Sequence, residues 1–281
     1  MASTCKVRND GLDKFYTKPD IALKCISKIK NWDNWDLVIE PSAGNGSFYN
    51  NIPVSNKIGL DIKPDSSDIT EMDFFEYKPQ KPGRIMVIGN PPFGKNSSLA
   101  IKFFNHAAKW AECIAFIIPR TFRRISVQNQ LDNSFHNIHD EDIPLSPCSF
   151  EPNMSVKCCF QIWEKRDEVR ERIVLPTTHN DWSFLSHGPK DEKNQPTPPT
   201  GSDFALLAYG GKCGRIVNSN LSELRPKSWH WIKSNIDTDI LKKRFESLDY
   251  SISENTARQN SIGRAELVHL YSSKLDHNVS P

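Results

Sequence analysis

The chain has 281 residues, and 37% of them are apolar, which suffices for one large domain or for a core with a smaller second part. Its 36 basic and 34 acidic residues leave a net charge of +2, so charge alone does not indicate nucleic-acid binding. An apolar stretch of about 18 residues is absent, as is a hydrophobic signal segment at the start, which argues against a membrane span and secretion.

The seven cysteines include no CxxC pair and no Cys/His spacing typical of a metal site. We therefore expect reduced thiols, no bound metal, and a location in the cytoplasm or the nucleus.

The first 165 residues alternate short apolar runs with amphipathic stretches. Pro19 suits the first position of a helix, and Ile21, Cys25 and Ile29 follow with helical spacing. The alternation predicts an α/β fold with a parallel sheet. In chain order we expect a helix over 19–30, strands over 37–39 and 57–60, a third strand segment over 68–73, a strand over 85–88, a helix over 98–110, and strands over 113–118 and 156–163.

The character of the sequence changes near Lys165, where a charged connector over 164–172 begins. A polar, proline-rich stretch over 188–201 follows and predicts a long loop or a disordered insert. We therefore divide the chain into a core over 13–165 and a C-terminal extension over 166–281. Within the extension we expect a hairpin from 204–209 and 215–217, and a helix over 235–248.

The segment Gly89-Asn90-Pro91-Pro92-Phe93 follows the apolar run 85–88 and is the most informative stretch of the chain. Two prolines fix their φ angles near −65° and end the strand, and Asn90 is restricted because it precedes a proline. A rigid turn would thus present a carboxamide and an aromatic ring beyond the sheet. This pair of groups suits an exocyclic amine on a flat heterocycle.

A second motif, Glu40-Pro41-Ser42-Ala43-Gly44-Asn45-Gly46, directly follows the first strand. A strand, a Gly-x-Gly turn and then a helix form the usual cradle for a nucleotide-like ligand. The second strand ends in Asp61, where a carboxylate can accept hydrogen bonds from ribose hydroxyls. An ordinary tight turn with a surface Asp would give the same pattern.

Asp73-Phe74 follows the third strand segment. Asp73 could accept a hydrogen bond from the amine of a cofactor adenine, with Phe74 covering the ring face. The alternative is a capping Asp in a solvated turn.

Together these segments resemble the class I S-adenosylmethionine-dependent methyltransferases, and within them the gamma-type N6-adenine enzymes, in which a target-recognition region follows the core. The resemblance covers about residues 13–165. It implies a Rossmann-like core with a mainly parallel seven-stranded sheet, a smaller C-terminal α+β extension, and S-adenosylmethionine as cofactor. The cofactor contacts implied by the resemblance are Phe15, Tyr16, Thr17, Glu40, Pro41, Ala43, Gly44, Gly46, Asp61, Ile62, Asp73 and Phe74.

The resemblance also assigns catalysis to Asn90, Pro91, Pro92 and Phe93. Asn90 Oδ1 and the Pro91 carbonyl would accept both hydrogens of the amine, Pro92 would set the turn, and Phe93 would stack on the base. Catalysis is then mostly positioning, which requires neither a metal nor a strong base.

The catalytic motif indicates the reaction better than the substrate, because enzymes with related motifs act on RNA adenines, on guanine N2 and on glutamine side chains. The segment Phe15-Tyr16-Thr17 favours N6 of adenine in DNA. An RNA adenine, ribosomal or next to an mRNA cap, is the first alternative. A non-catalytic binding subunit with this fold is the second.

Basic and aromatic residues are interleaved at two places that we expect to contact nucleic acid. Arg120, Arg123 and Arg124 follow the strand over 113–118, and Trp229 and Trp231 lie in the extension. The extension from 212 to 264 holds ten Lys and Arg against six Asp and Glu. The alternative for the two tryptophans is packing in a small core.

Overall fold

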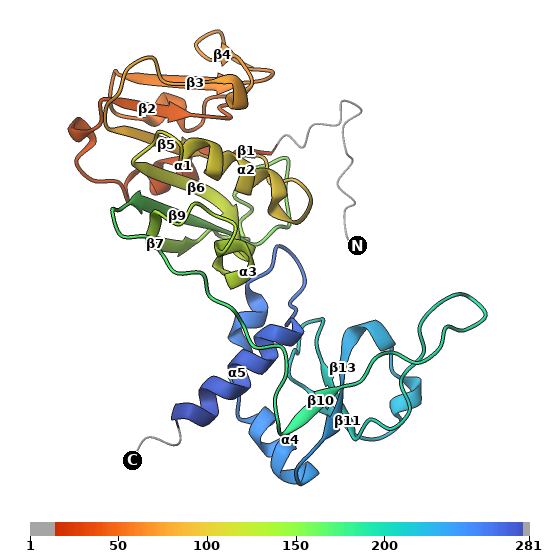
Figure 1. The fold of residues 1–281 in the computed structure, drawn as a ribbon. Coiled ribbons are helices and arrows are strands. Elements are labelled where there is room, and N and C mark those ends of the chain that lie inside the picture. The colour runs from red at the N-terminus through yellow and green to blue at the C-terminus, as the bar shows by residue number, and fades with distance from the viewer. Residues whose placement is uncertain (1–14, 278–281) are drawn as a thin grey trace. The chain divides into compact units, whose positions relative to one another are not determined.

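The computed structural model describes residues 15–277; residues 13 and 14, which open the predicted core, lie outside this range. The chain divides into two compact units, Met1–Arg172 and Ile173–Pro281 (Figure 1). The charged connector after Lys165 is held to the first unit, since Arg166 N–H donates to Ser134 O and the Arg170 guanidinium donates to Phe135 O. The connector thus extends the first unit beyond the last strand of its sheet.

The first unit is built on a seven-stranded sheet whose strands, in spatial order, are β4 (Thr70–Glu71), β3 (Lys57–Asp61), β2 (Leu37–Glu40), β5 (Ile85–Gly89), β6 (Cys113–Pro119), β9 (Cys158–Lys165) and β7 (Phe135–Asp142). The first five pair in parallel, whereas β9 runs antiparallel to both β6 and β7. Numbered along the chain within this sheet, the order is 3-2-1-4-5-7-6, which begins as a Rossmann sheet does. The expected Rossmann-like, mainly parallel sheet is confirmed.

The strand order reverses between β2 and β5, because β2 is followed along the chain by β3 on one side and is paired with β5 on the other. Ligands of such sheets bind outside the carboxyl ends of the strands at this reversal. Residues 41–48 leave β2 there, and residues 90–97 leave β5 beside them. The fold therefore brings the two motifs of the sequence together at one edge of the sheet, where the Ser42 hydroxyl donates to Asn90 O.

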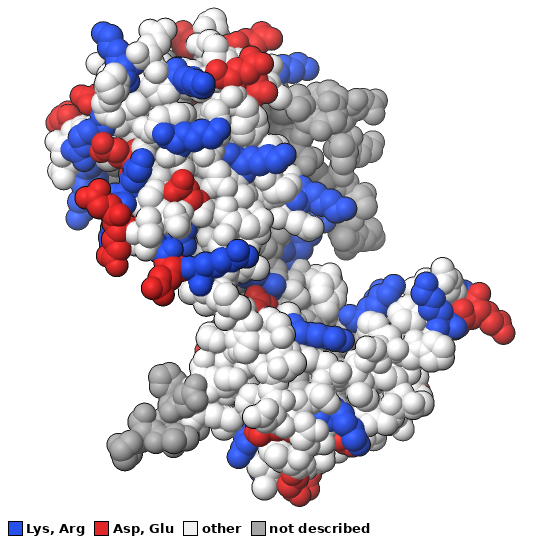
Figure 2. All heavy atoms as spheres, viewed as in Figure 1, with Lys and Arg blue, Asp and Glu red and all other residues white. Residues whose placement is uncertain are grey.

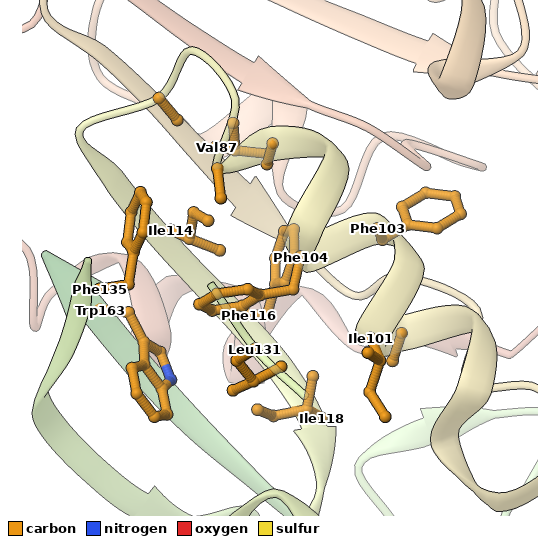
Figure 3. Packing of buried hydrophobic residues seen from close by; sticks show 14 of the residues in the cluster. Val87, Ile101, Phe103, Phe104, Ile114, Phe116, Ile118, Leu131, Phe135 and Trp163 are labelled. Atoms are coloured by element: carbon orange, nitrogen blue, oxygen red, sulfur yellow. The ribbon is translucent and has the colours of Figure 1, made fainter. Parts of the chain in front are cut away.

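The central strands are buried on both faces, which explains their unbroken apolar character. Every residue of β5 and β6 is buried. Helix α2 (Ser98–Ala107) covers one face, and its Phe104 ring meets Phe135 and Trp163 edge-on at 5.6 and 5.5 Å (Figure 3). Burial of one such ring contributes about 1.5–3 kcal/mol.

The other helices of the unit are α1 (Pro19–Ile26) and α3 (Ile125–Gln128), with short 3-10 helices η1 (Trp32–Asn34), η2 (Tyr49–Asn51), η3 (Phe74–Glu76), η4 (Lys95–Ser97) and η5 (Arg120–Arg123).

The helix expected after the Gly-x-Gly turn is absent from the described chain between β2 and β3. Only η2 occupies this connection. Pro53 and the short distance to Lys57, where β3 begins, leave no room for a longer helix. The loop therefore lacks the helix N-terminus that the usual nucleotide cradle provides.

A separate two-stranded sheet ties the start of the described chain to the first unit. Strand β1 (Tyr16–Thr17) pairs antiparallel with β8 (Phe150–Glu151). Lys18 N–H also donates to Ser149 O at 3.0 Å. The segment before α1 is thus held in place by its pairing with β8, which lies between β7 and β9 along the chain.

The second unit contains a four-stranded antiparallel sheet in the order β10 (Trp182–Phe184), β13 (Trp229–Ser234), β11 (Phe204–Leu207) and β12 (Ile216–Val217). The predicted hairpin is present as β11 and β12. The predicted helix is α4 (Thr238–Glu246), and Asp237 caps it by accepting the N–H groups of Asp239 and Ile240. The remaining elements are α5 (Arg264–His277), η6 (Leu221–Glu223), η7 (Pro226–Ser228) and η8 (Tyr250–Glu254).

Strand β7, at one margin of the large sheet, was not expected from the sequence. The strand lacks the usual alternation of apolar and polar residues, because most of its side chains are polar and at least partly exposed. The pairing of β7 with β9 shifts register between Asn137 and His139, which marks a bulge. Among the helices described between residues 15 and 277, none is long and apolar enough to cross a membrane.

Glu141 on β7 joins this margin to α1. Its carboxylate lies 2.5 Å from Lys24 Nζ and 2.8 Å from Lys28 Nζ. Hydrogen bonds from Lys24 and then Lys28 lower the pKa of Glu141 from 4.5 to about 2. Since the folded-state pKa is lowered, this stabilisation is present above about pH 4.5 and is lost as the pH falls toward 2.

Replacement of Glu141 by Gln should therefore destabilise the protein in a pH-dependent way. We expect Glu141→Gln to reduce the free energy of unfolding by about 1 kcal/mol at pH 6, because the pair is partly solvent-exposed, and to have no effect near pH 2. Urea unfolding across this pH range measures it. Glu76→Gln, at an exposed carboxylate, is the control, and equal effects of both variants at every pH would contradict the assignment.

Candidate active site

Residues 41–48, which we call the Gly44 loop, turn sharply at the carboxyl end of β2. Gly44 and Gly46 have φ angles of +52° and +81°, where glycine is favoured. Asp61, at the end of β3, accepts the Gly44 N–H at 2.8 Å through Oδ2 and the Lys63 N–H at 2.8 Å through Oδ1. A carboxylate has about four acceptor positions, so Asp61 retains two for a ligand.

The segment Phe15–Thr17 covers this loop. A Cβ atom on Gly44 would lie 2.7 Å from Cε1 of Tyr16, so the tyrosine ring packs directly on the glycine. The Tyr16 hydroxyl donates to the Asp65 carboxylate. Thr17 is buried, and among residues 15–277 its Oγ1 has no hydrogen-bond partner. The structure therefore brings together Tyr16, the Gly44 loop and Asp61.

Asn90 lies at the end of β5 beside the same segment. Its side-chain Nδ2 donates to Phe15 O at 3.2 Å, and its backbone O accepts the Ser42 hydroxyl at 3.1 Å. Asn90 Oδ1 is buried and has no partner in the part of the chain that the structure describes. Over the same residues, no hydrogen bond to Pro91 O is present. Asn90 Oδ1 and Pro91 O, on adjacent residues, are thus two acceptors without a partner among residues 15–277.

Phe93 is the last residue of the motif and is followed by η4 and α2. The Phe93 carbonyl accepts the N–H groups of Leu99 and Ala100, and its half-buried ring packs against the main core cluster. Pro91 is buried and Pro92 is half-buried. The four residues therefore form a rigid turn, as their sequence predicts, with one face of the core behind it.

Glu40 supports the Gly44 loop from below. It is 2% exposed, and its Oε2 accepts the Tyr49 N–H at 2.7 Å. Burial raises the pKa of the Glu40 carboxyl well above its usual range. The side chain also meets Gly89, whose added Cβ would lie 3.1 Å from Glu40 Cγ. In this structure Glu40 links the ends of β2 and β5, and a direct cofactor contact stays a prediction.

The expected adenine-covering role of Phe74 needs correction. Phe74 is 1% exposed and stacks on Phe103 at 5.1 Å, so it belongs to the core. Asp73 accepts the Phe75 N–H at 2.9 Å and caps η3, which matches the alternative weighed from the sequence. The exposed apolar side chains here include Ile62 at 50% exposure, and Met72 and Phe75 at 37% each. Phe75 is thus available to a flat ligand where Phe74 is not.

Two of the three arginines predicted to contact substrate are held by acidic partners. Arg120 Nη2 lies 2.7 Å from Asp142, and Arg123 lies 2.8 Å from Asp142 and contacts both oxygens of Asp140. The hydrogen bonds that Arg123 donates to Asp140 raise the pKa of Arg123. On the face of the first unit in Figure 2, basic and acidic side chains are interspersed. Arg120 and Arg123 therefore act within the fold, which corrects the expectation; for Arg124, substrate contact stays a prediction.

The two tryptophans expected to contact nucleic acid are core residues of the second unit. Trp229 is 7% exposed and Trp231 is fully buried, and both pack with Ala205 in one cluster. Trp231 Nε1 donates to Pro226 O at 3.1 Å. Arg215 lies over the Trp229 ring at 5.3 Å. A base cannot stack on rings that are covered in this way, so the packing alternative is correct.

Several contacts at the site were not predicted. Ser42 binds the backbone of Asn90, and Ser97 binds Thr121 across the ends of β5 and β6. Hydroxyl groups carry no periodic signal in a sequence, and both partners lie far apart along the chain. Their pairing follows only from the strand order of the sheet.

The residues present fit S-adenosylmethionine as far as their donor and acceptor atoms allow. Asp61 offers two further acceptor positions, and Thr17 offers a buried, unused hydroxyl. The Gly44 loop provides backbone close to Asp61. Among the described residues, no group of three His, Cys, Asp or Glu side chains could hold a metal ion.

No protein-family model matches the chain, and no curated protein sequence matches it. Solved structures with a similar fold include the 23S rRNA methyltransferase ErmE, with 14% identity, a TM-score of 0.42, and coverage of 56% of this chain and 71% of that one. PH1948 of Pyrococcus horikoshii, assigned provisionally as an RNA methyltransferase, has 15% identity, a TM-score of 0.42, and coverages of 57% and 91%. Thermoplasma acidophilum 1320 has 15% identity, a TM-score of 0.36, and coverages of 53% and 98%.

These similarities are too distant to assign a substrate. The strand order of the first unit, with antiparallel β9 placed between β6 and β7, is nevertheless that of the Rossmann-like class I methyltransferase fold. The second unit adds strands and helices beyond this fold.

Substitution of Gly44 should strongly weaken cofactor binding. Gly44→Ala would require a positive φ for alanine and would place Cβ against the Tyr16 ring, so we expect S-adenosylmethionine affinity to fall by about 100-fold. Isothermal titration measures this. Gly211→Ala is the matched control, because no atom lies within 4 Å of its added Cβ, and an unaltered affinity of Gly44→Ala would refute the cradle.

Truncation of Trp231 should unfold the second unit rather than weaken substrate contact. We expect Trp231→Ala to cost about 3–5 kcal/mol, as for other large core side chains. Urea unfolding followed by circular dichroism tests it, with Tyr209→Ala as the control because Tyr209 is 51% exposed. Normal stability of Trp231→Ala would contradict its core role.

Proposed function

We propose that this protein transfers a methyl group from S-adenosylmethionine to the exocyclic N6 amine of adenine in a nucleic acid. The observation that carries the proposal is Asn90 Oδ1, a buried acceptor without a partner among residues 15–277. An unpaired buried acceptor costs about 1–3 kcal/mol, and a ligand that donates a hydrogen bond to Asn90 Oδ1 would recover this cost.

The orientation of the Asn90 amide supports this role. The two ends of a carboxamide have nearly the same size, so only the hydrogen-bond pattern decides which end is the oxygen and which is the nitrogen. Phe15 O is an acceptor and therefore takes Nδ2 as its donor at 3.2 Å. Oδ1 is then directed away from Phe15, where it can accept a hydrogen bond from a substrate.

An exocyclic NH2 group has two hydrogens, and Asn90 Oδ1 together with Pro91 O offers two acceptors. The amine of adenine is a poor nucleophile because its lone pair is delocalised into the ring. Accepting both hydrogens favours a more tetrahedral nitrogen whose lone pair is available. This stabilisation is electrostatic and requires acceptors that are fixed before the substrate arrives.

Phe93 and the two prolines complete the substrate side. The backbone of Phe93 is fixed by α2 through the Leu99 and Ala100 N–H groups. An aromatic ring at this place can stack on a base that has left its helix. Pro91 and Pro92 restrict the backbone, so the two acceptors keep their spacing.

On the cofactor side, Asp61 would accept the ribose hydroxyls, and Thr17 and the Gly44 loop would hold the remainder. When bound, S-adenosylmethionine would supply a methyl group whose C–S electron pair stays on sulfur, so the amine nitrogen gains the methyl and releases one proton. The protein's own contribution is then alignment of the amine with the methyl group.

Adenine N6 occurs in both DNA and RNA, and the substrate contacts proposed here involve only the base. The sequence favours DNA through Phe15-Tyr16-Thr17, and an RNA adenine is the alternative substrate. In either case the base must be unstacked, which is least costly in a single strand. The fixed, unused acceptors support an enzyme over a non-catalytic binding subunit, which would not need them.

Labelled S-adenosylmethionine with single-stranded DNA, duplex DNA and RNA as separate substrates tests the proposal. We expect labelled N6-methyladenine by nucleoside mass spectrometry in at least one of them. Label in RNA alone would select the alternative substrate. Label only in protein, or in guanine, would refute the proposed amine while leaving the fold intact.

Asn90 should be essential for transfer and dispensable for cofactor binding. We expect Asn90→Ala to reduce kcat by roughly 100-fold or more, as when one transition-state hydrogen bond is removed from an active site. Cofactor affinity, measured by isothermal titration, should change by no more than about threefold because Asn90 faces the substrate. Asn133→Ala, at an exposed asparagine, is the control. Equal loss of binding and transfer in Asn90→Ala would contradict the assigned role.

A further inference from the structure

The chain between Phe93 and α2 has an unusual backbone. Gly94, Asn96 and Ser97 have φ angles of +67°, +53° and +63°. Glycine and asparagine tolerate this region, whereas serine does so at a steric cost. Such a conformation persists only where surrounding contacts enforce it, and such sites often have a functional reason.

The side chain of Ser97 supplies one of these contacts. Ser97 is 3% exposed, and its Oγ lies 2.7 Å from Oγ1 of Thr121. Glycine would adopt the same backbone without the steric cost, so a serine here is explained by its hydroxyl. The hydrogen bond connects the loop after β5 to η5, which follows the neighbouring strand β6.

Thr121 is itself held rigidly, because η5 is anchored on both sides of it. Arg120 binds Asp142, and Arg123 binds Asp140 and Asp142 on β7. Asp140 is fixed in turn by the side chain of Gln161 at 2.8 Å. Gln161 is 1% exposed and accepts the indole N–H of Trp163 at 3.0 Å. This series of charged and polar contacts, which runs from β9 through β7 to η5, gives Thr121 a fixed location.

We propose that Ser97 and Thr121 are positioning residues that hold Phe93 in the orientation needed to stack on the target base. The proposal rests on the proposed function and adds two residues to it. Phe93 is connected to Ser97 by only three residues, so the backbone of the loop determines where Phe93 begins. If the Ser97–Thr121 hydrogen bond is lost, the loop relaxes toward negative φ and Phe93 shifts.

The same contacts explain the roles of Arg120 and Arg123. Their positive charges are used inside the protein to fix η5, rather than on a phosphate backbone. The effect on catalysis is indirect, through Thr121 and the loop. Small displacements of positioning groups of this kind can reduce rates by about 100-fold.

Two substitutions at Thr121 separate the hydroxyl from the shape of the side chain. Thr121→Val keeps the branched shape and removes the hydroxyl, and Thr121→Ser keeps the hydroxyl. We expect kcat to fall by about 10- to 100-fold in Thr121→Val, with an unchanged KM for S-adenosylmethionine, and to recover to within about threefold in Thr121→Ser. Thr178→Val, at an exposed threonine of the second unit, is the matched control.

Hydrogen exchange of the amides of residues 94–99 provides a readout that does not depend on activity. It should become faster in Thr121→Val and remain near the parent rate in Thr121→Ser and Thr178→Val. Parental kcat in Thr121→Val, or failure of Thr121→Ser to restore it, would overturn the positioning role. If the parent protein transfers no methyl group to DNA or RNA, the proposed function fails and the catalytic role of Thr121 fails with it. Slow exchange in Thr121→Val would separately refute the hydrogen bond as the restraint on the loop.

Discussion

The hydrogen bond from Asn90 Nδ2 to Phe15 O is the constraint that sets the orientation of the Asn90 amide. It joins two segments that are 75 residues apart and selects one of two nearly isosteric orientations of a carboxamide. The segment that supplies the carbonyl is itself fixed by the β1–β8 pairing and by Tyr16 packed on Gly44. The Gly44 loop and Asn90 are therefore both in contact with the segment at β1, which belongs to neither motif.

Ionisable groups around this site serve mainly as internal supports. Glu40 is buried between β2 and β5, where it accepts a backbone N–H, and Arg123 is engaged by two aspartates on β7. These contacts leave few charged groups directed at a ligand, and Asp61 is the clearest one because its acceptor capacity exceeds its present partners. Recognition of an uncharged amine by uncharged acceptors is consistent with this distribution.

Local sequence patterns predicted the parts of the fold that local forces determine. The strand before Asn90 is continuously apolar because β5 is buried on both faces, and the prolines end it wherever it is placed. Side-chain exposure was less predictable: the aromatic pair Phe74-Phe75 gives no indication of which ring enters the core, and alternating tryptophans in β13 look the same on a surface as under a covering loop. The arginines of η5 were misassigned because their aspartate partners lie on β7, whose polar sequence does not resemble a strand.

The margins of the large sheet have a consequence for self-association. One margin is β4, which is two residues long, and the other is β7, whose ladder is interrupted at Ile138. An incoming strand needs an uninterrupted row of backbone donors and acceptors, and short or bulged edges deny it one. Copies of this unit should consequently not associate edge to edge through their sheets, even at high local concentration.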